Sequence, residues 1–358
     1  MLVGAAVAVL VAAVGITGYL LTRPGKSTAP TAVLDGTYRL DIDGAKTTRN
    51  GAPSPGSNVT SWYVFRSACG STGCTATGTR LDDKNHQLAF TPATTTVMHF
   101  VDGRWQKAPV RDQNQEPACF PSPAGGPPLP GADTNVLTLS WQPQPDGTLR
   151  GLKTQTIVSN ECGYGGSVWQ TPMVATRVGD RPPGITVADP ATVPAFQGPP
   201  PPVAGPTLNG TYRLDYDFSH QTFNNGVPVS DPGTNTAHWW AFRSLCISSG
   251  CVATGSQLSD TNQRQAAGLW RVLRFAGGHW QDTPYLETTH CPPVTQTAIG
   301  RVSWSWDPQP DGTLRGVDNN TLLTNECGDE GSVLHTPLVV TRVGDVPPGV
   351  VLADPALF

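Results

Sequence analysis

Apolar and polar residues alternate with a period of two over many short stretches of the chain beyond residue 33. Successive side chains of a β-strand point to opposite faces, so this alternation predicts strands with one buried and one solvated face. No stretch beyond residue 22 has a clear apolar period of about 3.6 residues, the period of a helix. The clearest alternating apolar sets are Met98 and Phe100; Leu137, Leu139 and Trp141; Leu273 and Phe275; and Val302, Trp304 and Trp306.

Turn signals separate these stretches. Asp102-Gly103, Asp146-Gly147 and Asp311-Gly312 are typical of hairpin turns, because glycine adopts a positive φ without steric cost. Roughly eight strands per half at this spacing predict an all-β fold. The order of the signals favours antiparallel β-meanders that close into barrels, which removes exposed edges, and a Greek-key sandwich is the alternative.

The two halves are copies of one domain. We therefore expect β domain copy one over residues 34–190, a proline-rich spacer over 191–207 and copy two over 208–358. Consecutive prolines at 199–202 favour a semi-rigid, extended spacer. The repeated segments are 35–41 with 209–215, 62–69 with 239–246, 143–151 with 308–316, 160–163 with 325–328, and 176–180 with 341–345.

The N-terminal segment is apolar. Residues 2–21 carry no charge, and a helix of this length spans roughly 30 Å, the hydrocarbon thickness of a bilayer. We predict a transmembrane helix over 1–22 and a stalk over 23–33, with a cleaved signal peptide and a secreted protein as the alternative. Arg23 and Lys26 follow the span, which by the positive-inside rule places the domains in the cytoplasm. The cysteines, if they form disulfides, favour the opposite side of the membrane. A segment with cytoplasmic charges ahead of the helix would resolve this conflict.

Each copy contains four of the eight cysteines, and an even set repeated in each domain predicts pairing within the domain. Disulfides place the domains outside the cytoplasm, at the cell membrane with the C-terminal domains extracytoplasmic. Zinc is the alternative, but it prefers short ligand pairs, often with histidine, and no histidine recurs at an equivalent position. We expect no metal. The favoured bridges are Cys69–Cys74, Cys119–Cys162, Cys246–Cys251 and Cys291–Cys327.

Composition narrows the classes of protein. The 358 residues are only 14% charged with a net charge of −4, which excludes the basic field of a nucleic-acid binder. The 39 glycines and 35 prolines exclude long helical bundles, and ten tryptophans in regular alternation exclude full disorder. The expected partners are the membrane, through the N-terminal helix, and an unknown small molecule or envelope component.

No complete catalytic set recurs in the two copies. Recurring serines lack a recurring histidine, so a shared serine–histidine mechanism fails. The alternative is a secreted envelope hydrolase in which Glu161 or Glu326 pairs with an aspartate such as Asp41 or Asp180. A local hydrogen bond or a pair with an arginine such as Arg66 is the simpler explanation. We expect no catalytic residues and no cofactor.

An aromatic–arginine strand is the better candidate for binding. Trp62, Val64 and Arg66 share one face of the predicted strand, and the opposite face, with Tyr63 and Phe65, resembles a core. An arginine beside a tryptophan can present its guanidinium to an anion in a ligand cavity, and an arginine stacked on the outer face is the competing interpretation. The candidate ligand-binding residues are Trp62, Arg66, Glu161, Trp239, Arg243 and Glu326.

Four motifs carry a resemblance to a known family: Trp-x-x-Phe-Arg-Ser-x-Cys, Gly-Cys-x-Ala-Thr-Gly, Asp-Gly-Thr-Leu-Arg-Gly and Asn-Glu-Cys-Gly. They resemble mycobacterial-type cell-envelope proteins and the extracytoplasmic sensor-like domains of actinobacterial transmembrane serine/threonine protein kinases. The resemblance covers both copies and implies sensor-like domains behind one membrane helix, without kinase motifs in this sequence. We expect anchored, non-catalytic domains that bind a ligand or envelope component. A structural or partner-docking role is a further alternative.

Overall fold

The computed structural model describes residues 33–71, 73–113, 133–290, 297–326 and 328–358. Within these ranges the chain is all-β, and its only helices are four single-turn 3-10 segments. Those segments are too short to cross a membrane, and no helix among the described residues is long and apolar enough to do so. The transmembrane helix predicted over 1–22 lies outside the described residues.

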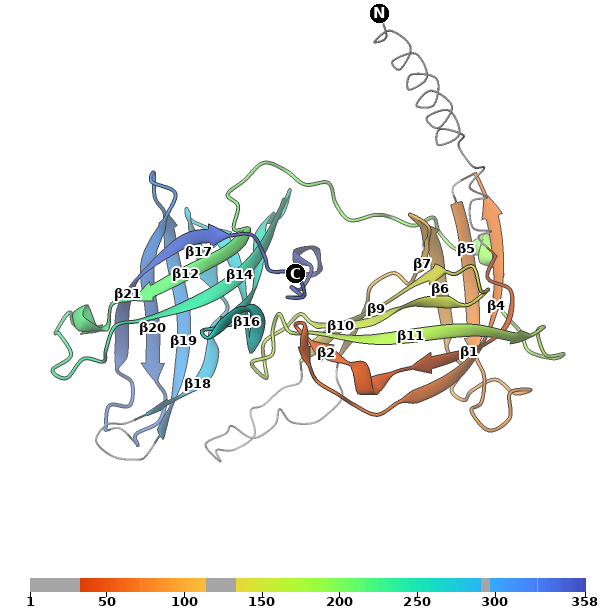
Figure 1. The fold of residues 1–358 in the computed structure, drawn as a ribbon, viewed down its shortest axis with the longest axis horizontal. Coiled ribbons are helices and arrows are strands. Elements are labelled where there is room, and N and C mark those ends of the chain that lie inside the picture. The colour runs from red at the N-terminus through yellow and green to blue at the C-terminus, as the bar shows by residue number, and fades with distance from the viewer. Residues whose placement is uncertain (1–32, 72, 114–132, 291–296, 327) are drawn as a thin grey trace, which may run out of the picture. The chain divides into compact units, whose positions relative to one another are not determined.

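Copy one forms a closed antiparallel sheet, here called barrel one, drawn in red to yellow-green in Figure 1. Each strand pairs with its neighbour along the meander, and the last strand returns to pair with the first. The eight strands of the wall, in spatial order, are β1 (Gly36–Ile42), β4 (Val59–Gly70), β5 (Gly73–Arg80), β6 (Thr95–Val101), β7 (Arg104–Gln106), β9 (Thr134–Pro143), β10 (Leu149–Ile157) and β11 (Val168–Gly179). Short additions are η1 (Gly44–Lys46), β2 (Thr48–Arg49), β3 (Ala52–Pro53), β8 (Val110–Gln113) and η2 (Pro190–Thr192).

Copy two repeats this topology as barrel two, drawn in green to blue in Figure 1. Its wall closes by pairing of the first strand with the last. The strands are β12 (Gly210–Tyr216), β14 (Thr236–Ile247), β15 (Gly250–Ser259), β16 (Asn262–Ala276), β17 (His279–Asp282), β19 (Thr297–Pro308), β20 (Leu314–Leu322) and β21 (Val333–Gly344). Short additions are η3 (Phe218–His220), β13 (Thr222–Phe223), β18 (Tyr285–His290) and η4 (Pro355–Leu357). The predicted closed meander is therefore confirmed, and the sandwich alternative is not the fold.

The alternating apolar residues fill the interior of each barrel. In barrel one the Phe65 ring packs edge-on against Trp141, with the ring centroids 5.8 Å apart. In barrel two Phe242 packs on Trp306 in the same way, at 5.9 Å. The strand beside each phenylalanine carries a glycine, Gly78 or its equivalent, because a Cβ there would collide with the ring. The predicted inward face of the strand at 62–69 is thus confirmed for Phe65, which is 2% exposed.

A strap follows the last strand of each barrel and covers the outer face of the wall; we define the straps as residues 180–192 and 345–357. In barrel one, Ile185 and Val187 pack against Val64. The Thr77 hydroxyl donates to the Ala188 carbonyl oxygen at 2.6 Å. In barrel two the equivalent bond runs from the Thr254 hydroxyl to the Ala353 carbonyl at 2.7 Å. This second apolar layer lies outside the barrels and buries residues on both faces of the wall.

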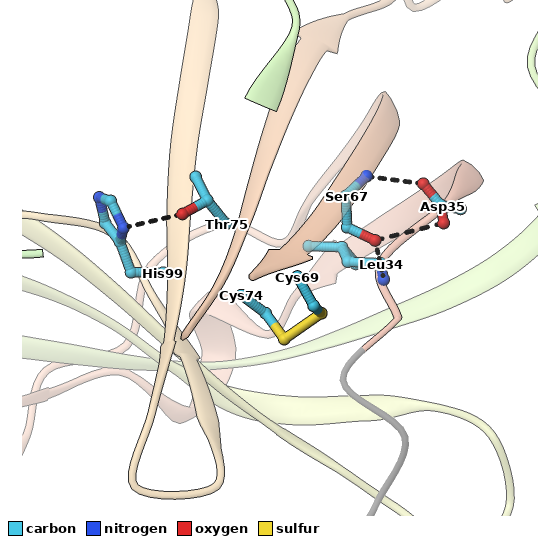
Figure 2. Close-up of a disulfide and its surroundings, with 7 residues drawn as sticks. All are labelled: Leu34, Asp35, Ser67, Cys69, Cys74, Thr75 and His99. Carbon is cyan, nitrogen blue, oxygen red and sulfur yellow. Dashed lines mark hydrogen bonds between the residues drawn. A yellow bond between two sulfur atoms is a disulfide. The ribbon is translucent and has the colours of Figure 1, made fainter. Parts of the chain in front are cut away.

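A disulfide joins β4 to β5 in barrel one, between Cys69 and Cys74, whose Cα atoms are 4.0 Å apart (Figure 2). Cys246 and Cys251 form the equivalent bridge between β14 and β15, with Cα atoms 3.9 Å apart. These two predicted bridges are confirmed. Cys162 is also disulfide-bonded. The second predicted bridge in each copy involves Cys119, Cys291 or Cys327, which lie outside the described residues, so its connectivity stays a prediction.

The start of each barrel is tied down beside this bridge. Figure 2 shows Ser67, on β4, between Leu34 and Asp35. The Leu34 N–H donates to the Ser67 hydroxyl at 3.0 Å, and the Ser67 N–H donates to the Asp35 carboxylate at 2.6 Å. In barrel two Leu208 and Asn209 hold Ser244 with the same two bonds, at 2.8 and 2.7 Å. Ser67 and Ser244 are therefore structural residues. The leucine that precedes each barrel is the same in both copies, whereas the next residue is aspartate in barrel one and asparagine in barrel two.

Candidate functional site

The predicted binding residues Trp62 and Arg66 lie on the outer face of β4, beneath the first strap. Trp62 packs against the cluster that contains Ile185 and Val187, and its ring stacks on His86 at a centroid distance of 3.7 Å. Arg66 pairs with Asp189 of the strap at 3.5 Å. Because the strap occupies this face, these contacts give both residues a structural partner.

The equivalent residues of barrel two lie in a similar setting. Arg243 is 3.8 Å from Asp354 of the second strap. The guanidinium carbon of Arg213 lies over the Trp239 ring, 5.9 Å from the ring centroid. Each strap aspartate also caps its 3-10 turn, since the Asp354 carboxylate accepts the Ala356 N–H at 3.2 Å. The recurring arginine therefore helps to hold the strap, a role that explains its presence in both copies.

The predicted glutamates lie elsewhere, in the loops that follow β10 and β20. Glu161 and Glu326 are both exposed. A hydrogen bond from the Thr324 hydroxyl lowers the pKa of Glu326 below its ordinary value. The aspartates considered as their catalytic partners are engaged by arginines: Asp41 by Arg39 at 2.9 Å and Asp180 by Arg177 at 2.5 Å. Ligand binding by the six residues proposed from the sequence stays a prediction.

A charged group lies inside barrel two, where the wall otherwise encloses apolar side chains. Arg271 shares the inward face of β16 with Leu273 and Phe275, and its side chain is only 6% exposed. Its guanidinium carbon lies 3.1 Å from the centroid of the Tyr285 ring and 5.0 Å from that of Trp304. Such placement over aromatic faces stabilises a desolvated cation.

Two carboxylates share this interior. Asp282 follows the buried Trp280 at the end of β17, and its side chain is fully shielded from solvent. Its Oδ2 lies 3.5 Å from Arg271 Nε, and its Oδ1 accepts the backbone N–H of Trp304 at 2.6 Å. Burial raises the pKa of Asp282 to about 7, against the opposing effect of the Arg271 charge.

Asp318, on β20, is the second carboxylate and pairs in register with Trp304 of β19. Burial, reinforced by the negative charge of Glu287, raises its pKa to about 8. The indole N–H of Trp304 opposes this shift, although its Nε1 makes no hydrogen bond of normal geometry. The Oδ1 atom of Asp318 is also buried without a hydrogen-bond partner. The charge of Arg271 also opposes the shift, but burial outweighs both effects.

Aromatic side chains form the rest of this interior end of the barrel. Trp240 and Trp304 are each 2% exposed, and their rings pack edge-to-face with centroids 4.9 Å apart. Burial also raises the pKa of Tyr216 and of Tyr285 well above the ordinary value. Four buried polar atoms in this group lack hydrogen-bond partners: Arg271 Nε, Asp282 Oδ2, Trp304 Nε1 and Asp318 Oδ1. We call the residues Tyr216, Trp240, Arg271, Asp282, Tyr285, Trp304 and Asp318 the interior cluster.

Buried polar atoms in proteins are almost always hydrogen-bonded, to protein groups or to ordered water. Arg271 Nε and Asp282 Oδ2 face each other as an ion pair at 3.5 Å, so Asp318 Oδ1 is the buried acceptor of this group that a small polar molecule could bind. Isolated buried donors such as the indole nitrogens of Trp105 and Trp280 lack this combination, because no unpaired carboxylate accompanies them among the described atoms.

Barrel one has different residues at the same places in its wall. Register places Thr96 where barrel two has Arg271, and Leu139 where it has Trp304. Lys153 pairs with Leu139 as Asp318 pairs with Trp304, and Lys107 follows Trp105 as Asp282 follows Trp280. Burial lowers the pKa of Lys107 below its ordinary value. Two basic residues thus stand where barrel two has two acids.

The interior cluster was not predicted from the sequence, because its charged residues do not recur in both copies, whereas the predicted candidates do. A signal was present in the alternation itself. Arg271 lies two residues before Leu273 on the predicted inward face, and Asp282 lies two residues after Trp280. A charge at an inward position of one copy, replaced by a neutral or opposite residue in the other, marks a place where the copies have diverged.

A family model described as the PknI serine/threonine-protein kinase sensor domain matches residues 29–192 and again residues 205–357. Serine/threonine-protein kinase PknI of Mycobacterium tuberculosis and that of Mycobacterium bovis are each 43% identical to the chain over 169 residues. The match covers 47% of this chain but only 28% of either kinase.

Two solved structures are also similar. The monomer form of the M. tuberculosis PknI sensor domain is 37% identical, and the match covers 46% of this chain and 100% of that one, with a TM-score of 0.38. The dimer form is 40% identical, and the match covers 38% of this chain and 82% of that one, with a TM-score of 0.34.

Proposed function

The chain belongs to the PknI serine/threonine-protein kinase sensor domain family, and from that premise we propose that it is a non-catalytic extracytoplasmic sensor module that binds a small polar ligand inside barrel two. The observation that carries the binding proposal is the interior cluster, in which Arg271, Asp282 and Asp318 bring charge into an aromatic core. Stability alone gives little reason to keep these charges, because well-packed apolar residues often serve as well.

The proposed location is supported by the disulfides. Cys69–Cys74 and Cys246–Cys251 are both formed, and such bridges persist in oxidising compartments. The uncharged segment 2–21 supports a membrane anchor ahead of the first barrel. A reporter enzyme that is active only outside the cytoplasm, fused after residue 358, tests this orientation. Activity from the fusion is expected, and an inactive but expressed fusion would contradict the extracytoplasmic placement.

The absence of catalysis is proposed from two observations. The family match is to the sensor portion of a kinase, and the recurring polar residues Arg66 and Arg243 are paired with strap aspartates. The exposed Glu161 and Glu326 lie in loops. An envelope hydrolase that used these glutamates would lose turnover in the Glu161→Gln and Glu326→Gln variants, whereas a sensor module would bind its ligand unchanged.

Ligand binding is tested by native mass spectrometry of the full chain extracted from its own membrane. We expect a co-purifying mass with the wild-type chain and its loss from the Asp282→Asn variant, in which an isosteric amide replaces the buried acid. Lys107→Gln, at the equivalent position of barrel one, is the matched control and is expected to retain the mass. Retention by Asp282→Asn would place the ligand elsewhere. A wild-type chain that carries no extra mass and responds to no small polar compound in a thermal-shift screen would contradict binding.

A further inference from the structure

We propose that the interior cluster takes a small cation of the primary-amine class, with its ammonium group against Asp318; this inference rests on the proposed function of barrel two. The structure supports it through the count of charges in the barrel, through the atoms that lack partners, and through the contrast with barrel one.

The interior carries one more carboxylate than cation. Arg271 is committed to Asp282, at 3.5 Å, and to the Tyr285 ring, at 3.1 Å from its centroid. Asp318 has no ion pair within the described part of the chain, and its Oδ1 is buried without a hydrogen-bond partner. The Arg271 charge acts on this carboxylate without pairing with it, and burial still outweighs that attraction, so uptake of a proton or of a further cation is favoured.

The surroundings of Asp318 favour a positive charge. Glu287, on β18, adds a negative charge that acts on the same carboxylate. The Tyr285 hydroxyl donates to Glu287 at 3.1 Å and so keeps that acid beside the cluster. Trp240 and Trp304 contribute ring faces, which attract a desolvated cation. An ammonium group also supplies hydrogen-bond donors to carboxylate oxygens, which a neutral ether or ketone cannot do.

Barrel one has the opposite charge at the equivalent positions, so we expect it not to bind an amine. Lys107 and Lys153 replace the two acids, and Leu139 replaces Trp304. An amine in barrel one would be repelled by these lysines and would have one aromatic ring fewer to contact. The chain therefore contains its own negative control, and the effect of an amine should be confined to barrel two.

The test is calorimetric titration of the full chain with ethanolamine, and in parallel with ethylene glycol, in which a hydroxyl replaces the amine. We expect binding of ethanolamine at about pH 8.5, and weaker binding toward about pH 5.5 because protons compete for Asp318. Ethylene glycol should not bind. Asp318→Asn should weaken ethanolamine binding about tenfold or more, whereas Lys153→Gln, the matched change in barrel one, should leave it unchanged.

A second variant keeps the test decisive if Asp318→Asn fails to fold. Glu287 is exposed, so Glu287→Gln should fold normally and should weaken ethanolamine binding about twofold to threefold through the lost negative charge. No binding of ethanolamine to the wild-type chain, or equal binding of ethylene glycol, would overturn the inference. If the co-purified mass is lost from Asp282→Asn while ethanolamine does not bind, the amine class is wrong and the proposed ligand site stands. If the mass survives in Asp282→Asn, the proposed site itself fails.

Discussion

Barrel one and barrel two share the topology and several key residues of their walls but differ in the side chains that fill their interiors. Phe65 on Trp141 is repeated as Phe242 on Trp306, and each strap is held by a threonine and an arginine of the wall. The interior cluster is present in barrel two alone, where Arg271 replaces a threonine. Residues that close the barrel are shared because both copies need them for folding, whereas the interior was free to change once the wall was stable.

The largest expected difference between the barrels comes from removing Arg271. Arg271→Ala leaves Asp282 without its ion-paired cation and removes the positive charge that acts on Asp318, and breaking a buried pair costs about 3–5 kcal/mol. Thr96→Ala, the equivalent change in barrel one, is the control and should cost about 1 kcal/mol. Urea denaturation of the full chain measures both, and peptide-level hydrogen exchange assigns each loss to a barrel. Equal losses would show that the charges of barrel two are not coupled.

Removing the short disulfide should destabilise the two barrels by nearly the same amount. Cys69 and Cys74 close a loop of five residues' separation, as do Cys246 and Cys251. Replacing either pair by serine should cost about 2 kcal/mol on the chain-entropy estimate for so short a loop. Thermal unfolding of the two double variants provides the measurement. A much larger loss in one barrel would mean that its bridge supports more than the local hairpin.

The pH dependence should have opposite signs in the two barrels. Burial raises the pKa of Asp282 to about 7 and of Asp318 to about 8, so folded barrel two binds more protons than the unfolded chain between about pH 4 and 8. Its free energy of unfolding therefore rises as pH falls through this window, by up to about 1.4 kcal/mol per pH unit for each of the two acids. In barrel one the lowered pKa of Lys107 means that folding releases protons, so this contribution favours folding as pH rises toward the ordinary lysine value.

Calorimetric unfolding of the full chain between about pH 8.5 and about pH 5.5 checks this sign. Asp318→Asn should flatten the dependence of barrel two, whereas Lys153→Gln should not affect it. If barrel two instead became less stable as the pH was lowered from about 8.5 to about 5.5, the burial of both acids would be contradicted.

The smallest expected effects are at the outer ion pairs. Arg177 and Asp180 are repeated as Arg342 and Asp345, and both aspartates are 94% exposed. Asp180→Ala and Asp345→Ala should each cost about 0–1 kcal/mol, because exposed pairs are screened by solvent. The arginines keep a bond to the start of the barrel, since Arg342 Nε donates to the Asn209 carbonyl at 2.9 Å. Denaturation midpoints measure the change, and unequal values would reveal a difference in the outer surfaces.

Much of the fold followed from local features of the sequence. Alternation at Leu137, Leu139 and Trp141 predicted a strand because a strand exposes every second side chain to the same face. Asp102-Gly103 predicted a tight turn, and both residues adopt positive φ, at 50° and 75°. The spacing of Cys69 and Cys74 predicted their bridge because so few residues separate them.

The candidate site could not be predicted in the same way. The sequence proposed Arg66 as a ligand contact from its neighbour Trp62, but whether that face is open depends on the strap, which returns from more than a hundred residues away. The glutamates were proposed with aspartates that turn out to be paired with Arg39 and Arg177. Such partnerships are set by which strands become neighbours, and local patterning carries no record of that order.

The duplication, the period of the strands, the turns and the short disulfides could all be predicted from the sequence, because each depends on residues close together in the chain or on direct repetition. The meeting of Arg271, Asp282 and Asp318 inside one barrel could not be predicted in this way, because the three residues come from three different strands. Closure of the sheet brings these strands around a common interior and excludes water from it. The same closure turns three ordinary charged residues into a desolvated cluster with raised acid pKa values and unpaired polar atoms.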